Sequence, residues 1–512
     1  MSSANRYGVK AEPAAPRRAW LGNASALLAG ALLPLAYAPY GFFPLAVLLP
    51  AALFTLWLRV SPGRALWRGW LFGAGMFGTG VYWIYISIHQ YGNAGVALAA
   101  VLTAGFVAGM ALFPAVTGWL VNRYFPVAET LRLVLVMPAV WTLMEWVRGW
   151  FLTGFPWLDL GYSQAGTPLA IGLAPLFGVY GVSWAVALSA GLLVVLARAH
   201  HPPRWLMFGT GMLVLWFGAT LLGQVQWTQP QGNPLQVSLI QGDIVQNLKW
   251  NPAVLEHTLD LYRRLTREHW NSALIVWPET AVPAFYQQVQ PFLAGLGKEA
   301  REHGSSLLIG VPVWDAVNGR YYNAVASLGE QTAFYYKHHL VPFGEYIPFK
   351  NLLGGVLDVL HIPMSDFSAG ARDQPPLPAA GYRAGVSICY EDAFGTQVIR
   401  ALPQAAFLVN VSDDAWFGDS AAPYQHLQIA RLRAQETGRY LLSATNTGIT
   451  AIIGPHGRME ATVPAFQVAV LTGTIQPMRG ATPYVRWGNG PVLAGLAVAL
   501  AAAAAFGRRR NT

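Results

Sequence analysis

Long apolar stretches separated by short polar loops fill the first 224 residues of this 512-residue chain, and one more lies near its C-terminus. A helix that crosses a membrane needs about 20 predominantly apolar residues. The stretches that approach this length predict about eight membrane-spanning helices, seven of them before residue 225. Their approximate ranges are 20–36, 42–58, 69–88, 94–121, 131–150, 169–197, 205–223 and 488–506.

The pattern changes between residues 230 and 480, where short Val- and Ile-rich runs alternate with amphipathic segments such as 252–270 and 425–438. Short apolar strands that alternate with helices are typical of a layered α/β domain with buried sheets. The pattern therefore predicts three parts. They are an N-terminal transmembrane domain of seven helices (1–224), an α/β domain (225–484), and a C-terminal transmembrane helix with a basic tail (485–512).

Composition and charge placement favour a multi-pass membrane protein. Hydrophobic residues make up 54% of the chain and charged residues 11%, against about 25% charged in ordinary globular domains. The net charge of +9 comes with no basic run interleaved with aromatic residues in the polar region, so we expect no nucleic-acid partner.

The basic residues also indicate an orientation. Lys and Arg precede the first stretch and occupy alternate loops and the tail, whereas loops 37–41, 89–93 and 151–168 contain none. By the positive-inside rule both termini are cytoplasmic, and the α/β domain lies on the other side of the membrane. For a bacterial inner membrane that compartment is the periplasm.

Three strings in the α/β region end an apolar run with a residue that could do chemistry. They are "LIVWPET" with Glu279, "FYYKHHLVPFGEY" with Lys337 and Glu345, and "GVSICYED" with Cys389, the single cysteine of the chain. Strand ends in an α/β domain point into the crevice outside the sheet. A base, a cation and a thiol that meet there could carry out acyl transfer.

Each of these residues also has an ordinary structural interpretation. A free cysteine is among the most buried residue types, and a single one cannot form an intramolecular disulfide. Glu279 after Trp-Pro could cap a turn, and Lys337 could be a solvated loop cation. Spacing alone leaves both interpretations open.

The strings "WPET", "KHHLVPFGEY" and "CYEDAFG", in this order, resemble the Glu–Lys–Cys motifs of the nitrilase superfamily. With the flanking apolar stretches and "NVSDDAWFG…QHLQIARLRAQETGR", the whole chain resembles the apolipoprotein N-acyltransferase family. The resemblance implies an αββα sandwich for the α/β domain. It implies Cys389 as nucleophile, Glu279 as general base, Lys337 as oxyanion-stabilising cation, and Glu345 as a supporting acid/base or positioning residue.

The resemblance extends to residues that would bind substrate. Trp250 in "QGDIVQNLKW" matches a tryptophan at the family's lipid entrance, and Tyr390 and Glu391 match the two residues after its cysteine. Two positions depart from the family pattern: Asp413 stands where Asn is expected, and Tyr424 where His is often found. The extra carboxylate of Asp413 could add a local charge or pair with a nearby arginine.

The implied reaction has two halves. A fatty acyl chain moves from the sn-1 position of phosphatidylethanolamine to Cys389, and the α-amine of an apolipoprotein's diacylglyceryl-cysteine then takes it from the thioester. A membrane-tethered amidase that passes the acyl group to water is the alternative, and a transporter is disfavoured because no inverted repeat is visible. We expect membrane lipids and these two substrates as partners of a monomer.

No cofactor or metal is expected, because His89, His338, His339 and His426 show no metal-binding spacing. The apolar segment 351–367 predicts either a helix packed on the sandwich or a mobile arm that gates lipid entry.

Glu145 and Arg148, spaced i, i+3 near the end of the fifth apolar stretch, are expected to pair with each other. A contact with a phospholipid headgroup is the alternative.

Overall fold

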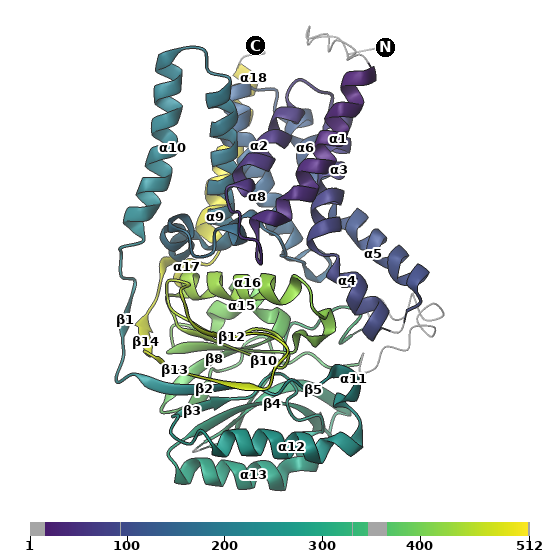
Figure 1. The fold of residues 1–512 in the computed structure, drawn as a ribbon. Helices are drawn as coiled ribbons and strands as arrows, with labels where there is room; N and C mark the ends of the chain where they lie inside the picture. Colours follow the sequence, from purple (N-terminus) through teal and green to yellow (C-terminus); the bar gives the residue numbers. More distant parts are fainter. Residues whose placement is uncertain (1–15, 93, 330, 347–365, 510–512) are drawn as a thin grey trace.

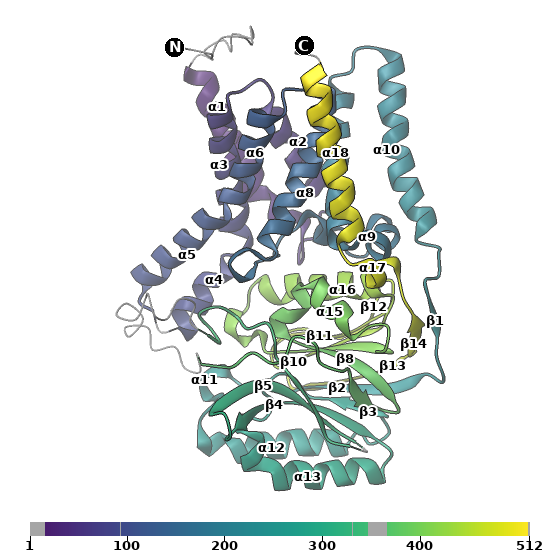
Figure 2. The same ribbon diagram turned by 180° about the vertical axis from the view of Figure 1, so that it is seen from behind.

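A helical bundle and an α/β sandwich are stacked end to end in the computed structural model (Figure 1). The structure describes residues 16–92, 94–329, 331–346 and 366–509. The N- and C-terminal helices both start or end at the side of the bundle remote from the sandwich (Figures 1 and 2). The predicted arm, 351–367, lies outside the described residues except for Asp366 and Phe367.

Apolar helices rich in small residues form the bundle. They are α1 (Pro16–Leu32), α2 (Leu45–Trp57), α3 (Pro62–Gly80), α4 (Trp83–Ile86), α5 (Val96–Met110), α6 (Leu112–Tyr124), α7 (Glu129–Leu131), α8 (Met137–Arg148), α9 (Pro168–Ala197), α10 (Pro202–Leu222) and α18 (Gly490–Arg509). A Cβ atom on Gly30 of α1 would fall on the backbone of Phe72 in α3. Glycine thus allows the close approach that membrane helices need for van der Waals packing.

The number of spans differs slightly from the expected eight. Six helices in the described part of the chain are long and apolar enough to cross a membrane, or seven if α3 and the segment Trp83–Tyr91, bent by 55°, count as one span. The segment predicted at 42–58 forms only the 13 residues of α2, because residues 37–44 fold as a turn. α2 is therefore shorter than the about 20 residues that a straight span requires.

Two six-stranded sheets face each other in the sandwich, in the orders β13-β2-β3-β4-β5-β6 and β12-β11-β10-β9-β8-β7. The strands of the first sheet are β2 (Leu235–Gln241), β3 (Leu274–Val276), β4 (Ser306–Asp315), β5 (Arg320–Leu328), β6 (Ala333–Tyr336) and β13 (Ala469–Ile475). Those of the second are β7 (Leu377–Ala379), β8 (Tyr382–Ile388), β9 (Phe407–Ser412), β10 (Leu441–Thr445), β11 (Thr450–Ile453) and β12 (Met459–Val463).

Helices cover both outer faces of the sandwich. α12 (Pro252–Arg267) and α13 (Tyr286–Glu302) lie on the first sheet, while α15 (Gly395–Val398) and α16 (Ala422–Thr437) lie between the second sheet and the bundle (Figure 1). The expected αββα sandwich is thus confirmed. Strands β1 (Thr228–Pro230) and β14 (Met478–Gly480) pair with each other, which joins the two connections between sandwich and bundle.

The core between the sheets places the strand ends that carry the site. Buried side chains of β2, β3 and β4 pack against those of β8 and β9, as with Val276 and Ile388, which have no exposed surface. β2, β3 and β4 run parallel, and so do β8, β9 and β10. The carboxyl ends of parallel neighbours meet at one edge, and there the two sheets bring their following turns together.

Candidate active site

Cys389 directly follows β8 in a backbone conformation that non-glycine residues rarely adopt. Its φ is +52°, in the left-handed region that costs an L-residue about 1–2 kcal/mol. The N–H of Ile388 donates to the Glu391 carboxylate (2.8 Å), and the amide of Asn410 donates to the carbonyl of Cys389 (3.0 Å). Such bonds hold a strained turn in place, and this one presents a half-buried thiol.

Glu279 lies in the turn after β3, on the sheet opposite Cys389. Its Oε1 accepts hydrogen bonds from the Asn323 amide (2.7 Å) and from Lys337 Nζ (3.2 Å), and its Oε2 accepts one from the N–H of Asp413 (2.9 Å). The turn packs so closely on β4 that a Cβ on Gly310 would meet the backbone of Glu279. The carboxylate is therefore held from both sheets.

Lys337, the residue after β6, is 1% exposed and lies between two carboxylates. Its Nζ donates to Glu279 (3.2 Å) and to Glu345 (2.8 Å). Burial opposes the charged form of this lysine, but Glu279 and Glu345 outweigh burial and raise its pKa. The ammonium is thus a fixed positive charge in the site.

The same surroundings keep the nucleophile protonated at rest. Burial raises the pKa of the Cys389 thiol well above its usual range, and the charge of Glu279 adds to this, while Lys337 lowers the pKa only in part. A protonated thiol is a poor nucleophile, so Cys389 needs a base that takes its proton during the attack. A carboxylate and an ammonium at this position can supply proton transfer and oxyanion stabilisation.

Asn323 is a residue of the site that the sequence pattern did not predict. Its side-chain amide donates both to Glu279 (2.7 Å) and to Glu345 (3.1 Å), and Glu345 also accepts from the N–H of Val341 (2.8 Å). The sequence carries one signal: Asn323 is a polar residue inside the strand-like run "YYNAVASL", and the structure buries it to 3% exposure.

Glu391 has no exposed surface. Its carboxylate accepts hydrogen bonds from five protein donors between 2.6 and 3.0 Å, namely the N–H groups of Ile388, His338 and His339, the Gln397 amide and the Tyr335 hydroxyl. Burial raises its pKa. The implied substrate contact does not fit this geometry, because Glu391 ties the turn of Cys389 to the segment after Lys337.

Tyr390 links the site to the membrane part of the chain. Its hydroxyl donates to the carbonyl of Gly154 (2.6 Å) in the loop after α8, and its ring stacks on Trp157 with centroids 6.1 Å apart. Tyr390 is half-buried, and its ring also contacts those of His339 and Phe394. A loop of the bundle therefore forms one wall beside the nucleophile.

Trp250 follows the short helix α11 (Gln246–Lys249) and is 38% exposed. The residue before it, Lys249, is buried and donates to the Asp413 carboxylate and to the carbonyl of Glu279 (3.3 Å). Asp413 thus pairs with a lysine rather than with an arginine. The other departure, Tyr424, is 40% exposed.

His426, on α16, lies behind the nucleophile between two carboxylates. Its Nδ1 is 3.1 Å from Asp414 Oδ1 and its Nε2 is 3.0 Å from Asp392 Oδ1. Burial opposes the imidazolium, but the two carboxylates outweigh burial and raise the pKa of His426. Within the residues that the structure describes, no group of three or more His, Cys, Asp or Glu is arranged to hold a metal ion.

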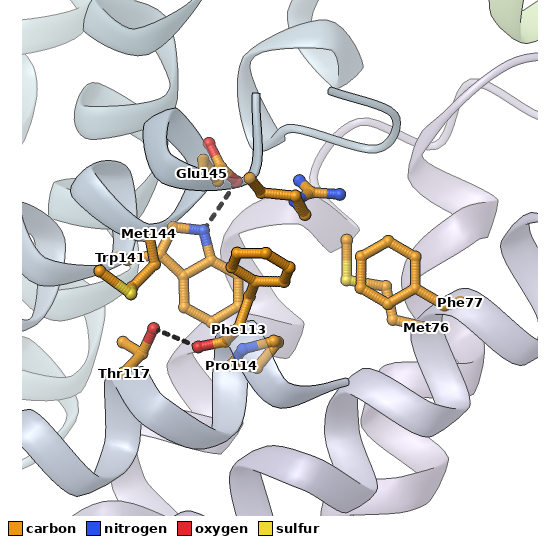
Figure 3. A pocket seen from close by; sticks show the side chains of 9 residues that line it. Met76, Phe77, Phe113, Pro114, Thr117, Trp141, Met144 and Glu145 are labelled. Atoms are coloured by element: carbon orange, nitrogen blue, oxygen red, sulfur yellow. Dashed lines mark hydrogen bonds between the residues drawn. The ribbon is translucent and has the colours of Figure 1, made fainter. Parts of the chain in front are cut away.

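Arg148 and Glu145 line a small, otherwise mostly apolar cavity in the bundle (Figure 3). Arg148 donates to Asp159 (2.5 Å) and to the carbonyl of Trp157, whereas Glu145 accepts from Trp141 Nε1 (2.8 Å). The expected Glu145–Arg148 pair is therefore wrong. The loop after α8 folds back over the helix and offers Arg148 a carboxylate that helical spacing does not reveal.

Comparison with known proteins covers both parts of the chain. Residues 29–192 match the family model of the apolipoprotein N-acyltransferase N-terminal domain, and residues 236–484 match that of carbon-nitrogen hydrolases. Three relatives named apolipoprotein N-acyltransferase align over most of their length. The protein of Methylococcus capsulatus is 50% identical over 95% of this chain and 96% of its own. Those of Nitrosomonas europaea and Azotobacter vinelandii are 48% and 47% identical, over 93% and 96% of this chain and 96% of each relative.

Proposed function

Since the chain belongs to the apolipoprotein N-acyltransferase family, whose members acylate lipoproteins, we propose that Cys389, Glu279 and Lys337 carry this reaction. Cys389 is the nucleophile, Glu279 the general base and Lys337 the cation that stabilises the oxyanion. The observation that supports these roles is the convergence of a strained thiol, a carboxylate and a buried ammonium from three different strand ends.

In the first half-reaction, Glu279 takes the thiol proton while Cys389 Sγ attacks the ester carbonyl of a phospholipid. Lys337 stabilises the tetrahedral oxyanion, because an ammonium fixed before the reaction needs no reorganisation as charge develops. When the C–O bond breaks, the leaving lysophospholipid oxygen takes the proton from Glu279. The product is a thioester on Cys389, and Glu279 is again a carboxylate.

In the second half-reaction, the amine of the acceptor replaces the alcohol of the donor. The amine attacks the thioester carbonyl and passes a proton to Glu279, and the C–S bond then breaks. The leaving sulfur takes that proton back, so the site returns to its resting thiol. The amine belongs to the N-terminal diacylglyceryl-cysteine of an apolipoprotein, and the donor is phosphatidylethanolamine, acylated at sn-1.

The remaining residues support these steps. Glu345 positions Lys337, and Glu391 positions the turn of Cys389. Trp250 and Tyr390 contact the acyl chains, since both are aromatic residues that keep some exposed surface, Tyr390 directly after the nucleophile and Trp250 directly after Lys249, which binds the Glu279 carbonyl. We propose that the protein acts as a monomer, since no step above calls on a residue of a second copy.

Contacts at both ends of the bundle support the proposed orientation in a bacterial inner membrane. Arg59 and Arg198, from two of the Arg-containing loops, both contact Glu129 at one end (2.5 and 3.5 Å). The Lys- and Arg-free loops meet the sandwich, through Ala38 N–H to Gln428 (3.0 Å) and through Tyr390 to Gly154. Although α2 is short, it links Ala38, which contacts the sandwich, to Arg59 at the opposite end of the bundle.

These contacts support an arrangement with the positive loops on one side of the membrane and the sandwich on the other. We therefore propose a transmembrane domain at 1–224, a periplasmic catalytic domain at 225–484 and a terminal span at 485–512, with both termini cytoplasmic.

The test is intact mass measurement of purified protein incubated with phosphatidylethanolamine that carries a tagged sn-1 acyl chain. One added acyl group, removable by hydroxylamine, is expected on the wild type and absent from Cys389→Ala and strongly reduced in Glu279→Gln. An unmodified, well-folded wild type would contradict the proposed roles. An adduct that persists in Cys389→Ala would contradict the assignment of the nucleophile.

A further inference from the structure

Lys249 is a second buried lysine beside the general base, and no step above uses it. It is 2% exposed, at the end of α11 and directly before Trp250. Its Nζ donates to the Asp413 carboxylate, itself 5% exposed, and to the backbone carbonyl of Glu279 (3.3 Å). An ammonium so buried needs a partner, and Asp413 supplies one.

These contacts close a ring around Glu279. Lys249 binds the carbonyl of Glu279 and the side chain of Asp413, and the N–H of Asp413 donates to Glu279 Oε2 (2.9 Å). The carbonyl bound by Lys249 belongs to the peptide that leads into Thr280, whose φ of +48° is strained. Strained turns persist where neighbouring groups over-determine them.

The side chain of Asp413 is fixed independently. Its Oδ1 accepts hydrogen bonds from the Asn446 amide (3.2 Å) and from the N–H of Ala415 (3.4 Å). Because these bonds fix Asp413, its backbone N–H is also held in the direction of Glu279 Oε2. Lys249 joins the turn after β3 in one sheet to the turn after β9 in the other.

We propose that Lys249 and Asp413 form a positioning pair that orients the Glu279 carboxylate and balances the charge around this base, which in turn acts on the Cys389 thiol. The inference rests on the proposed role of Glu279 but concerns two residues with no role in the steps above. The site contains other charged or titratable groups that face Glu279 or Cys389, namely Lys337, Glu345, Asp414, His426 and Tyr390. Removing one member of the pair leaves an uncompensated charge next to Glu279. This charge is negative when Lys249 is removed and positive when Asp413 is removed.

The effect of this charge on the ionisation of the Cys389 thiol can be measured without any acyl donor, because Cys389 is the single cysteine of the chain. The pH dependence of alkylation by iodoacetamide reports where the Cys389 thiol ionises. Lys249→Met leaves an unpaired carboxylate, so the midpoint pH of alkylation should rise by about one unit. Asp413→Asn leaves an unpaired ammonium, so the midpoint pH should fall by about one unit. The double variant Lys249→Met/Asp413→Asn restores neutrality and should return near the wild-type midpoint.

Acylation by tagged phospholipid gives a second readout. Each single variant should form the thioester about tenfold to a hundredfold more slowly, and the double variant should stay about tenfold slow because the tie to Glu279 is missing. Lys298→Met, which removes a lysine whose side chain is 75% exposed, is the matched control and should match the wild type in both assays.

Asp413→Asn keeps the shape of the side chain, so its downward shift tests the inference even if Lys249→Met folds poorly. Midpoints that move in the same direction, or no further than in Lys298→Met, would overturn the inference. Because alkylation needs no phospholipid, an unacylated wild type would contradict the proposed function while leaving this test decisive.

Discussion

Replacing Lys337 by Met separates the electrostatic role of this lysine from its catalytic role. Its ammonium is 1% exposed and compensates two carboxylates whose side chains are only 9% and 13% exposed, Glu279 at 3.2 Å and Glu345 at 2.8 Å. Removing one partner of a buried ion pair costs about 3–5 kcal/mol, since an unpaired charge stays in a low-dielectric site. Two carboxylates would here be left without their cation.

The loss of stability in Lys337→Met can be measured by thermal unfolding of the protein in detergent. A loss of this size corresponds to a decrease in melting temperature of about 10 °C. The double variant Lys337→Met/Glu345→Gln removes one of the two stranded charges and should recover about half of the loss. Fluorescence of a thiol-reactive dye follows unfolding, because Cys389 is the single cysteine.

Activity should not recover in parallel. Loss of one preorganised oxyanion-stabilising group slows the chemical step by about 10²–10³, and Glu345→Gln returns no cation to the site. The expected result is a double variant that is more stable than Lys337→Met but equally slow in thioester formation. A melting temperature of Lys337→Met within about 2 °C of the wild type, or a double variant that acylates at the wild-type rate, would refute this reasoning.

Three further outcomes follow from the same contacts. Because burial raises the pKa of Cys389, its alkylation rate should stay low near neutral pH and rise only above the pKa of an ordinary cysteine, about 8.5; a plateau already reached at neutral pH would contradict a resting thiol. Tyr390→Phe removes the 2.6 Å bond to Gly154 and should slow acylation about tenfold, whereas an unchanged rate would show that the loop contact is dispensable. Glu391→Gln replaces one of the two accepting oxygens by an N–H₂ that faces either the two donors on Oε2 or the three on Oε1. It should lower the free energy of unfolding by about 1–3 kcal/mol; unchanged thermal unfolding would argue against its positioning role.

The parts of the fold visible in the sequence are those set by local pattern. Strand-like runs ending in Glu279 and Cys389 could be recognised because a strand end and its following turn are adjacent in sequence. The apolar lengths of the helices likewise predicted most spans. The exception is α2, whose expected start is taken by the turn at residues 37–44.

Contacts between distant segments could not be read in this way. Helical spacing predicted that Arg148 pairs with Glu145, but the loop after α8 supplies Asp159 instead. The sequence predicted a role for Trp250 but none for Lys249 before it, and only the meeting of the two sheets shows that Lys249 reaches Asp413. Such partners depend on tertiary packing, which one sequence does not reveal.

The most direct test of the account is the fate of a preformed acyl group. Wild-type protein carrying a tagged acyl chain on Cys389, freed of donor lipid, would be mixed with a diacylglyceryl-cysteine peptide, and the tag would be followed by mass spectrometry. The account predicts that the tag moves to the peptide amine as an amide, at a rate that depends on Glu279, with little free fatty acid. Release of the tag as free fatty acid, with the peptide unmodified, would contradict acyl transfer to lipoproteins and indicate a hydrolase.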